Sequence, residues 1–399
     1  LASMSGRPCI LCKESSRVVV LAGGDAVERA LSLQSGRDVV DALRCRGWNS
    51  VSLWELAEHP DDRARQMRQC FCCEESQVDV VFYVMYGKNE RGDEQGFLET
   101  LRIPYTFSSL FTTSVGGNKM QCKRYLLGHG VLDVDDEEKI GSSVANQQAR
   151  AVPSATLVLP LDNVSTLNVS DLPPFPIMVK DPNLGSSKGV WRVESAPELV
   201  ALLERLQKQQ SEAGGEPIEL LVEKFVVGTD IVVCMAENME TGELDVWPVI
   251  EFDMDPTKFQ DLAAKNSLWG WDDDGAATVG EQVTKTVKRC PATKISSEIY
   301  TQAQREAKRI FKSIDASGAL NIEFRVDHIT NALYFIEMSV VPGMTSGSVH
   351  AVTAAQAGVS YEELVERILR CAKLKSYFGH RVSSSQSGES TDQSASMRV

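Results

Sequence analysis

Short apolar runs alternate with amphipathic stretches in the first third of the chain. Each run has the length of a buried strand, and the runs span residues 17–24, 50–56 and 78–87. Between the first two, residues 32–48 carry apolar side chains at helical spacing, and we expect Ser32 to cap this helix and Gly47 to end it. Strands that alternate with helices in this way predict a parallel, doubly wound α/β sheet.

The remainder of the chain mixes strands and helices in a less regular order. Helices are predicted over residues 113–130, 197–210, 295–313 and 359–373. Strands are predicted at both ends of 175–193, on either side of a glycine-rich turn, and within 218–238, 244–252 and 321–339. Residues 253–292 lack periodicity, and we expect a long mobile loop there.

Five segments are expected along the chain. They are an irregular lead-in of residues 1–16, an N-terminal α/β domain of 17–112, a central domain of 113–217, a C-terminal domain of 218–376 and a tail of 377–399. The strands of 218–238 and 244–252 are assigned to the third of these domains. The tail is expected to be disordered because it is rich in serine and low in complexity.

Composition narrows the class of function. The 399 residues carry a net charge of −14 and a pI near 5.0, whereas binding to nucleic acid or to an anionic membrane needs a basic surface. No stretch reaches the length of about 18 apolar residues that a membrane span needs. We therefore expect a cytoplasmic protein with no nucleic-acid or membrane partner, or an organellar one if a leader preceded Leu1.

The predicted hairpin of 321–339 carries the first candidate site. Its arms place Glu323 opposite Glu337, and like charges that face each other directly destabilise a strand pair. A divalent cation that prefers oxygen ligands would neutralise them. Asn321 and Ser339 flank the pair on the same face and are weaker partners for a cation and its phosphates.

Other motifs have both a functional and an ordinary structural interpretation. The sequence GSSKG at 185–189 lies between two strands and is therefore no P-loop, but it could cover a phosphate or form a plain hairpin turn. Lys180 could reach that phosphate or lie in solvent. Glu223 or Asp230 could hold ribose hydroxyls, or simply belong to an edge strand and its turn. Glu28 lies at the carboxyl end of the first strand, where ligands of open α/β sheets bind.

Taken together and in this order, these segments resemble the D-alanine–D-alanine ligase family of the ATP-grasp superfamily. The resemblance extends over residues 17–375 and rests on segments such as LAGGDAVERALSLQSG, MVKDPNLGSSKGV, LLVEKFVVGTD and YFIEMSVVPGMTSGS. It implies a three-domain ATP-grasp architecture, α+β in its ATP-grasp part, with ATP between the central and C-terminal domains. In this family the γ-phosphate of ATP passes to the carboxylate of one D-alanine, and the amine of a second attacks the acyl phosphate. Mg²⁺ (or Mn²⁺) is the implied metal.

The resemblance also implies a role for each matching residue. Glu28 would hold the ammonium of the first amino-acid substrate, and Ser348 the carboxylate of the second. The implied metal ligands are Glu323, Glu337 and Ser339. The implied nucleotide-binding residues are Lys119, Lys180, Ser186, Ser187, Glu223, Lys224, Phe225, Val226, Asp230 and Lys265. The catalytic group predicted on this basis is Glu28, Ser186, Tyr86, Asn321 and Ser348.

The chain departs from the family's pattern at several of these positions. Tyr86 stands where the family has a histidine, and Ser339 where it has an asparagine. Asn321 replaces an arginine that stabilises the transferring phosphoryl, and such an arginine is worth about 10³–10⁵ in rate. We hypothesise that Arg325 or Lys188 partly replaces the missing charge.

Three functions remain open at this point. The first is an ATP-dependent carboxylate–amine ligase that makes D-alanyl-D-alanine, and the second is a ligase for another pair of small amino acids. The third is a catalytically degraded nucleotide-binding module that pairs with a second, intact ligase-like unit. A homodimer is also expected, because members of the family commonly form dimers.

Overall fold

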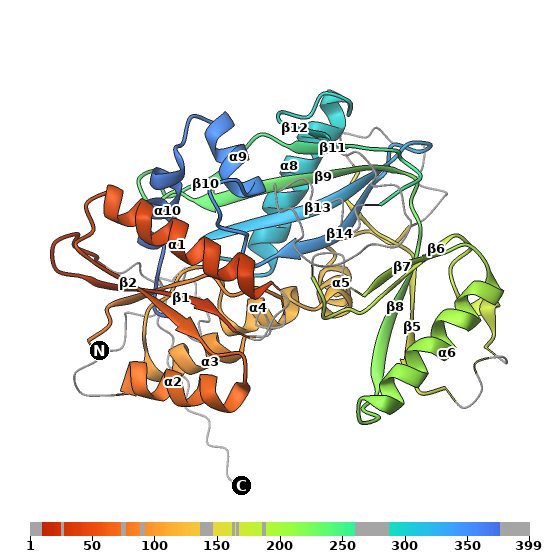
Figure 1. Ribbon diagram of the computed structural model, residues 1–399. Helices are drawn as coiled ribbons and strands as arrows, with labels where there is room; N and C mark the ends of the chain where they lie inside the picture. Colours follow the sequence, from red (N-terminus) through yellow and green to blue (C-terminus); the bar gives the residue numbers. More distant parts are fainter. Residues whose placement is uncertain are drawn as a thin grey trace, which may run out of the picture.

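The structure is a computed structural model that describes residues 10–24, 28–72, 77–87, 92–135, 147–161, 164, 167–185, 189–259 and 287–375. Three sheets and their helices make up this part of the chain, and Figure 1 follows them from the N-terminal strands to the last helix. None of the helices described is both long enough and apolar enough to cross a membrane. The tail predicted to be disordered lies outside the described residues.

The N-terminal unit is built on a parallel sheet of three strands in the order β2–β1–β3. The strands are β1 (Arg17–Gly23), β2 (Ser50–Leu56) and β3 (Val80–Tyr83), and the helices are α1 (Arg29–Cys45), α2 (Pro60–Cys72) and α3 (Asp93–Leu101). In Figure 1, α1 lies above the strands and α2 and α3 lie below them. Helices that cover a parallel sheet allow its strands to be apolar throughout, and the predicted parallel α/β unit is confirmed.

The start of α1 differs from the prediction. The helix begins at Arg29, so Ser32 lies inside it and is not its cap. The buried Ser32 hydroxyl donates to the Val84 carbonyl at 2.6 Å and accepts from the Gly23 amide at 2.8 Å, which fastens α1 to the sheet. Gly47 follows the end of the helix with φ of +85°, a conformation that glycine adopts without steric cost.

A second sheet is antiparallel and has the order β5–β8–β6–β7. It consists of β5 (Ser154–Leu159), β6 (Ile177–Lys180), β7 (Val190–Val193) and β8 (Ile218–Lys224), accompanied by α6 (Ala196–Glu212) and the short 3₁₀ helix η5 (Val169–Asp171). The two strands predicted within 175–193 are confirmed and pair in antiparallel fashion. Grouping residues 218–224 with the C-terminal strands was wrong, because β8 pairs with β5 and β6.

The largest sheet has seven strands in the order β12–β11–β9–β13–β14–β4, with β10 paired to β9. They are β4 (Arg150–Ala151), β9 (Gly228–Glu237), β10 (Leu244–Val246), β11 (Ile250–Asp253), β12 (Val287–Arg289), β13 (Ala319–Asp327) and β14 (Leu333–Ser339). The loop predicted for 253–292 is wrong at 287–289, since these residues form β12 against β11. Residues 260–286 lie outside the described part.

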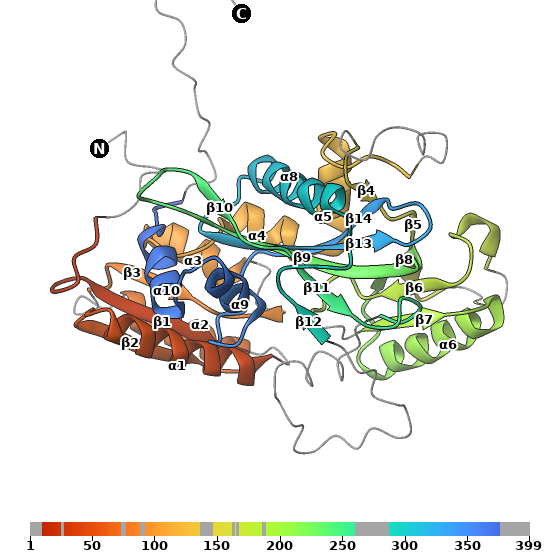
Figure 2. The ribbon, with the colours of Figure 1, turned by 90° about the horizontal axis from the view of Figure 1, so that it is seen from above.

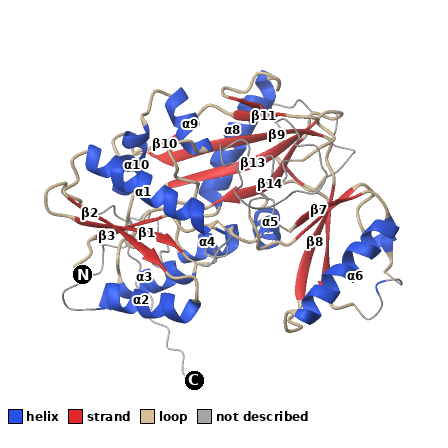
Figure 3. Cartoon of the chain, in the orientation of Figure 1, coloured by secondary structure: helices blue, strands red, loops and turns tan. Residues whose placement is uncertain are grey.

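Helices surround this sheet, as Figure 3 shows. They are α4 (Leu110–Gly116), α5 (Lys119–Gly128), α8 (Ser297–Ser313), α9 (Val349–Gln356) and α10 (Tyr361–Arg370). The single helix predicted for 113–130 is therefore two helices. Asn118 separates them, because its side chain accepts a hydrogen bond from the Gln121 amide at 2.9 Å and caps α5. The break makes Lys119 the first residue of α5.

Two large apolar cores and one small cluster stabilise the described part of the molecule, and the two large ones are separate. One extends from the N-terminal sheet into the seven-stranded sheet and includes Val20 and Ile322. The other lies between the four-stranded sheet and α6 and includes Val179 and Leu203. Figure 2 shows the four-stranded sheet and α6 to one side of the larger body. The exact domain boundaries stay a prediction.

Candidate active site

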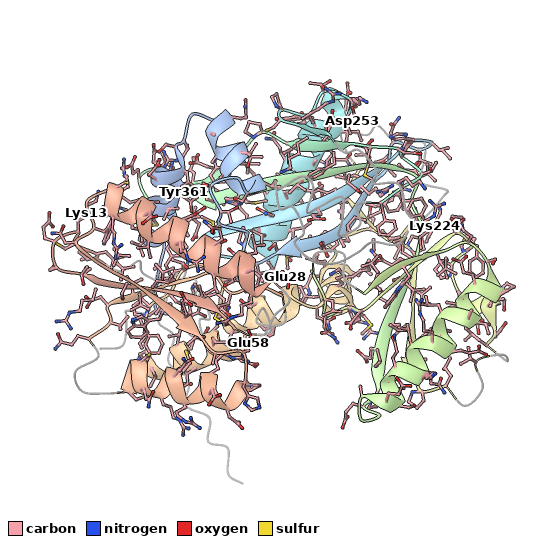
Figure 4. All side chains as sticks on the ribbon, in the orientation of Figure 1. Lys13, Glu28, Glu58, Lys224, Asp253 and Tyr361 are labelled. Atoms are coloured by element: carbon pink, nitrogen blue, oxygen red, sulfur yellow. The ribbon has the colours of Figure 1, made fainter. Side chains whose placement is uncertain are left out.

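Two adjoining cavities lie where the three sheets approach one another. The N-terminal unit and the ends of β13 and β14 line the first, and the four-stranded sheet and the same two strands line the second. Lys119, Glu323 and Glu337 line both, so the cavities meet at these three side chains. Figure 4 shows Glu28 at the start of α1, on the first cavity, and Lys224 at the end of β8, on the second.

The hairpin of β13 and β14 brings two carboxylates together, as predicted. Glu323 pairs with Glu337 across the strands, and Lys119 Nζ lies 2.7 Å from Glu337 Oε2. Ser339 Oγ donates to the Val341 carbonyl at 3.1 Å, which leaves the hydroxyl oxygen able to accept or to ligate. Two carboxylates and a hydroxyl are the oxygen donors that Mg²⁺ and Mn²⁺ prefer, so these residues fit such an ion.

Lys119 connects this pair to the residues before the glycine-rich turn. Its Nζ also donates to the Leu184 carbonyl at 2.7 Å, and its amide donates to the Pro182 carbonyl at 3.0 Å. The neighbouring Asn118 side chain donates to Asn183 Oδ1 at 2.8 Å. The start of α5 therefore fixes the segment that leads into the predicted phosphate-covering loop.

Part of that loop and one further predicted residue lie outside the described residues. These are Ser186, Ser187, Lys188 and Lys265. Gly185 is described, and a Cβ built on it would lie 3.3 Å from Glu28 Oε1. The Glu28 carboxylate therefore reaches across the first cavity to the beginning of the turn.

A buried ion triad supports the second cavity. Glu223 is 1% exposed and lies between Lys123, which contacts its Oε1, and Lys180, whose Nζ lies 2.5 Å from its Oε2. Burial by itself would raise the pKa of Glu223, but the two lysines outweigh that effect and lower it to about 2. Both carboxylate oxygens are thus occupied, and the predicted contact of Glu223 with a nucleotide stays a prediction.

Acid is expected to weaken the fold through this triad. A folded-state pKa of about 2 against the ordinary 4.5 means that Glu223 stabilises the fold above pH 4.5. The difference corresponds to roughly 3 kcal/mol, which is lost as the pH falls from about 4.5 to about 2. Urea unfolding at pH 5, 4 and 3 measures this loss. Glu219→Gln, at an exposed position of β8, should keep the pH dependence of the wild type. Glu223→Gln should flatten it.

Arg325 lies on the wall of the second cavity and is 5% exposed. Its Nη1 lies 2.7 Å from Asp230 Oδ1, and its Nε donates to the Val226 carbonyl at 2.6 Å. Its Nη2 donates to the Pro256 carbonyl at 3.0 Å and to the Lys258 carbonyl at 2.7 Å. It lines the second cavity but not the first. The hypothesis that Arg325 replaces the charge missing at residue 321 is therefore wrong, because its donors are committed elsewhere.

The ring of Phe225 closes this end of the second cavity. The guanidinium carbons of Arg192 and Arg325 lie 4.3 and 5.1 Å from its centroid. Positive charge near an aromatic face is stabilising. Phe225 and Val226 are thus fixed in place, and Asp230, whose Oδ1 contacts Arg325, also lines the cavity.

Contacts from the N-terminal unit hold the loop that leads to Ser348. Tyr86 Oη accepts from the Met344 amide at 3.0 Å, and Asp38 Oδ2 accepts from the Ser346 amide at 2.9 Å. Tyr361 Oη, from α10, donates to the Met344 carbonyl at 2.6 Å. Ser348 Oγ accepts from the Ala351 amide and caps α9. Tyr86 therefore contacts the loop backbone while its ring lines the first cavity.

Comparison with known proteins decides the family. The model described as D-ala D-ala ligase C-terminus matches residues 162–370, which is more than half of the chain. The chain belongs to the D-alanine–D-alanine ligase family. It is 30% identical over 362 residues to the D-alanine–D-alanine ligase of Anaeromyxobacter sp. (strain K), with 90% of this chain and 97% of the relative covered. The ligase of Geobacter sulfurreducens is 28% identical over 364 residues, with 91% and 96% covered.

Solved structures in this family have the same fold. The D-alanine–D-alanine ligase of Bacillus anthracis, in complex with ATP, superposes with a TM-score of 0.64 at 20% sequence identity, with 90% of this chain and 97% of that chain covered. The predicted ATP-grasp architecture with an N-terminal parallel α/β unit is therefore confirmed.

Two residues of the site had no predicted role. Lys123 lies four residues after Lys119 on α5, and this helical spacing was a signal that could have revealed it. No sequence signal indicates His350, because it meets Asn321 only where β13 and α9 pack together.

Proposed function

We propose that this member of the D-alanine–D-alanine ligase family is an ATP- and Mg²⁺-dependent carboxylate–amine ligase that joins two D-alanine molecules through an acyl phosphate. The observation that carries the proposal is the meeting of the two cavities at Lys119, Glu323 and Glu337. A nucleotide in the second cavity and an amino acid in the first would bring phosphate and carboxylate together at this junction. The names of the relatives and the ATP in the Bacillus anthracis complex support the same assignment.

Different residues would bind the nucleotide phosphates and the two amino-acid substrates. Lys180, at the end of β6, and Lys119, at the start of α5, would hold the phosphates, as positively charged ammonium groups do. Glu28 would hold the ammonium of the first D-alanine, and Ser348 the carboxylate of the second. A metal ion bound by Glu323 and Glu337 would neutralise charge that develops on the phosphate oxygens.

Phosphate release from ATP tests this proposal directly. We expect release to depend on both Mg²⁺ and D-alanine and to yield the dipeptide, detected by mass spectrometry. A panel of other small amino acids tests the second candidate, which is favoured by Tyr86 and Asn321 on the wall of the first cavity. Nucleotide that raises the melting temperature, without turnover on any amino acid, would reject both ligase proposals in favour of a binding module.

Tyr86→Phe is expected to weaken binding of the second amino acid. The change removes the acceptor of the Met344 amide and loosens the loop before Ser348. A hydrogen bond of this kind is worth about 1 kcal/mol, so the KM for the second amino acid should rise about fivefold with a smaller change in the KM for ATP. Initial rates with varied D-alanine measure it. Tyr83→Phe removes a different buried hydroxyl, the one that contacts Glu94, and should leave both KM values unchanged.

A further inference from the structure

Asn321 has a buried histidine as its partner. His350, the second residue of α9, is 0% exposed, and its Nδ1 lies 2.5 Å from Asn321 Oδ1. The ring of Trp247 packs edge-on against the imidazole, with the ring centroids 4.6 Å apart and an interplanar angle of 80°. The histidine is therefore held on more than one side, and Asn321 is the polar side chain that the imidazole contacts among the described residues.

The position of the proton on His350 follows from its surroundings. Nε2 is buried and has no hydrogen-bond partner among the described residues. A buried N–H without an acceptor is rarer and costlier than an unfilled lone pair, so the proton belongs on Nδ1. Burial also lowers the pKa of His350 to about 3, which keeps the ring neutral. Nδ1–H then donates, and Asn321 Oδ1 accepts.

This contact settles which way the Asn321 amide points. The amide is planar, so when Oδ1 faces His350 the Nδ2 group faces away from it. Nδ2 makes no hydrogen bond within the described part of the chain, and Asn321 lines the first cavity together with Glu323 and Ser339. The residue is also directly opposite Ser339 in the hairpin, which lines the first cavity as well.

We propose that His350 is a positioning residue that holds the side-chain amide of Asn321 in one orientation. In this orientation the two Nδ2 hydrogens of Asn321 point into the first cavity. There they donate to an anionic oxygen of the reacting carboxylate or phosphoryl group. A fixed neutral donor thus stands where the family has arginine. The identity of that oxygen, as part of a carboxylate or phosphoryl group, rests on the proposed function. The contact between His350 and Asn321 does not depend on it.

Variants at both positions test the proposal in the full-length chain. His350→Leu removes the donor and should lower kcat about 10- to 100-fold, the range for one hydrogen bond to a charged group, with little change in the KM for ATP. His350→Asn restores a donor near the position of Nδ1 and should recover most of the loss. Asn321→Leu should resemble His350→Leu, and the double variant should be no slower than either single variant.

The control is a variant that changes α9 elsewhere. Thr353→Val removes a buried hydroxyl that donates to the helix backbone at Val349 and His350 and contacts the Cys234 thiol, away from the His350 imidazole, and its kcat should match the wild type. Melting temperatures show that each variant is folded. Equal kcat for His350→Leu and wild type, or losses that simply add in the double variant, would overturn the proposal.

Nuclear magnetic resonance gives a readout that needs no turnover. The chain has five histidines, so His350 can be identified by the signal that His350→Asn removes. With ¹⁵N-labelled histidine, we expect a neutral ring protonated at Nδ1, and a proton on Nε2 would contradict the assignment. The side-chain amide signal of Asn321 should shift on addition of D-alanine with Mg²⁺ and the β,γ-methylene analogue of ATP. No shift would contradict a donor in the cavity. If wild type fails to turn over but both signals behave as expected, the proposed function fails and the positioning role stands.

Discussion

Glu323→Gln is expected to lower Mg²⁺-dependent turnover by about 10²–10³, because a metal ion contributes several kcal/mol of charge stabilisation to a transferring phosphoryl group. Glutamine has nearly the same shape but lacks the charge that would bind the ion. Lys119 lies 2.7 Å from the opposing Glu337, and Glu323 supplies the second carboxylate of the predicted metal site. Steady-state rates over a range of Mg²⁺ concentrations give the size of the loss and any increase in the Mg²⁺ requirement.

The same variant should affect stability in the opposite direction. Like charges directly opposite in a strand pair cost up to about 1 kcal/mol, so without Mg²⁺ the glutamine variant should be slightly more stable than wild type. Mg²⁺ together with ADP should raise the melting temperature of wild type much more than that of the variant. Glu219→Gln, exposed on β8, serves as the matched charge control and should change neither rate nor metal response. A Glu323→Gln enzyme with normal turnover would show that the metal is bound elsewhere.

Glu223→Leu is expected to destabilise the fold by about 3–5 kcal/mol, because it leaves two ammonium groups buried without a counter-charge. Lys123 is 3% exposed and Lys180 is 7% exposed, and both contact the Glu223 carboxylate. Burial also lowers the pKa of Lys123, so this lysine should lose its proton in the variant at a lower pH than an ordinary lysine. The loss of stability should therefore be smaller at pH 9 than at pH 7. Urea unfolding at both pH values measures it.

A triple variant separates the buried charges from the packing of these side chains. Replacing all three residues, as Lys123→Met, Glu223→Leu and Lys180→Met, removes every charge of the triad. Buried ion groups replaced together by apolar residues often cost nothing or even stabilise, by about 1–4 kcal/mol. The triple variant should therefore recover most of the stability lost in Glu223→Leu. If it is less stable than the single variant, the side chains matter for their shape and not for their charge.

Local patterns predicted the elements well where local forces decide them. The apolar run of 17–24 became β1, the glycine after α1 adopts a positive φ, and the hairpin of 321–339 has the expected register. The predictions that were wrong concern residues whose contacts are with segments far away in the sequence. Ser32 bonds Val84 instead of capping a helix, and β8 joins the strands of the central segment instead of those that follow it. In each case the competing contact is far away in the sequence and leaves no periodic signal.

In the candidate site, too, local patterns predicted some residues and long-range contacts decided others. The carboxylate pair of Glu323 and Glu337 could be read from strand alternation, and the family resemblance pointed to Lys119 and Lys180. The role suggested for Arg325 was wrong because its four acceptors come from two separate stretches of the chain, 226–230 and 256–258. A long side chain can reach in several directions, so the sequence does not specify which acceptors it meets.

The sequence by itself determined that this protein has an α/β N-terminal unit and an acidic hairpin, since apolar periodicity is a property of consecutive residues. Its resemblance to a known family implied the ATP-grasp body. The same resemblance showed that asparagine stands in that hairpin where the family has arginine. Only the tertiary structure decided what the replacement does. The packing of α9 on the seven-stranded sheet brings His350 within 2.5 Å of Asn321, and a buried imidazole needs a partner for its N–H. The charge at this position is gone, but the structure retains an oriented donor.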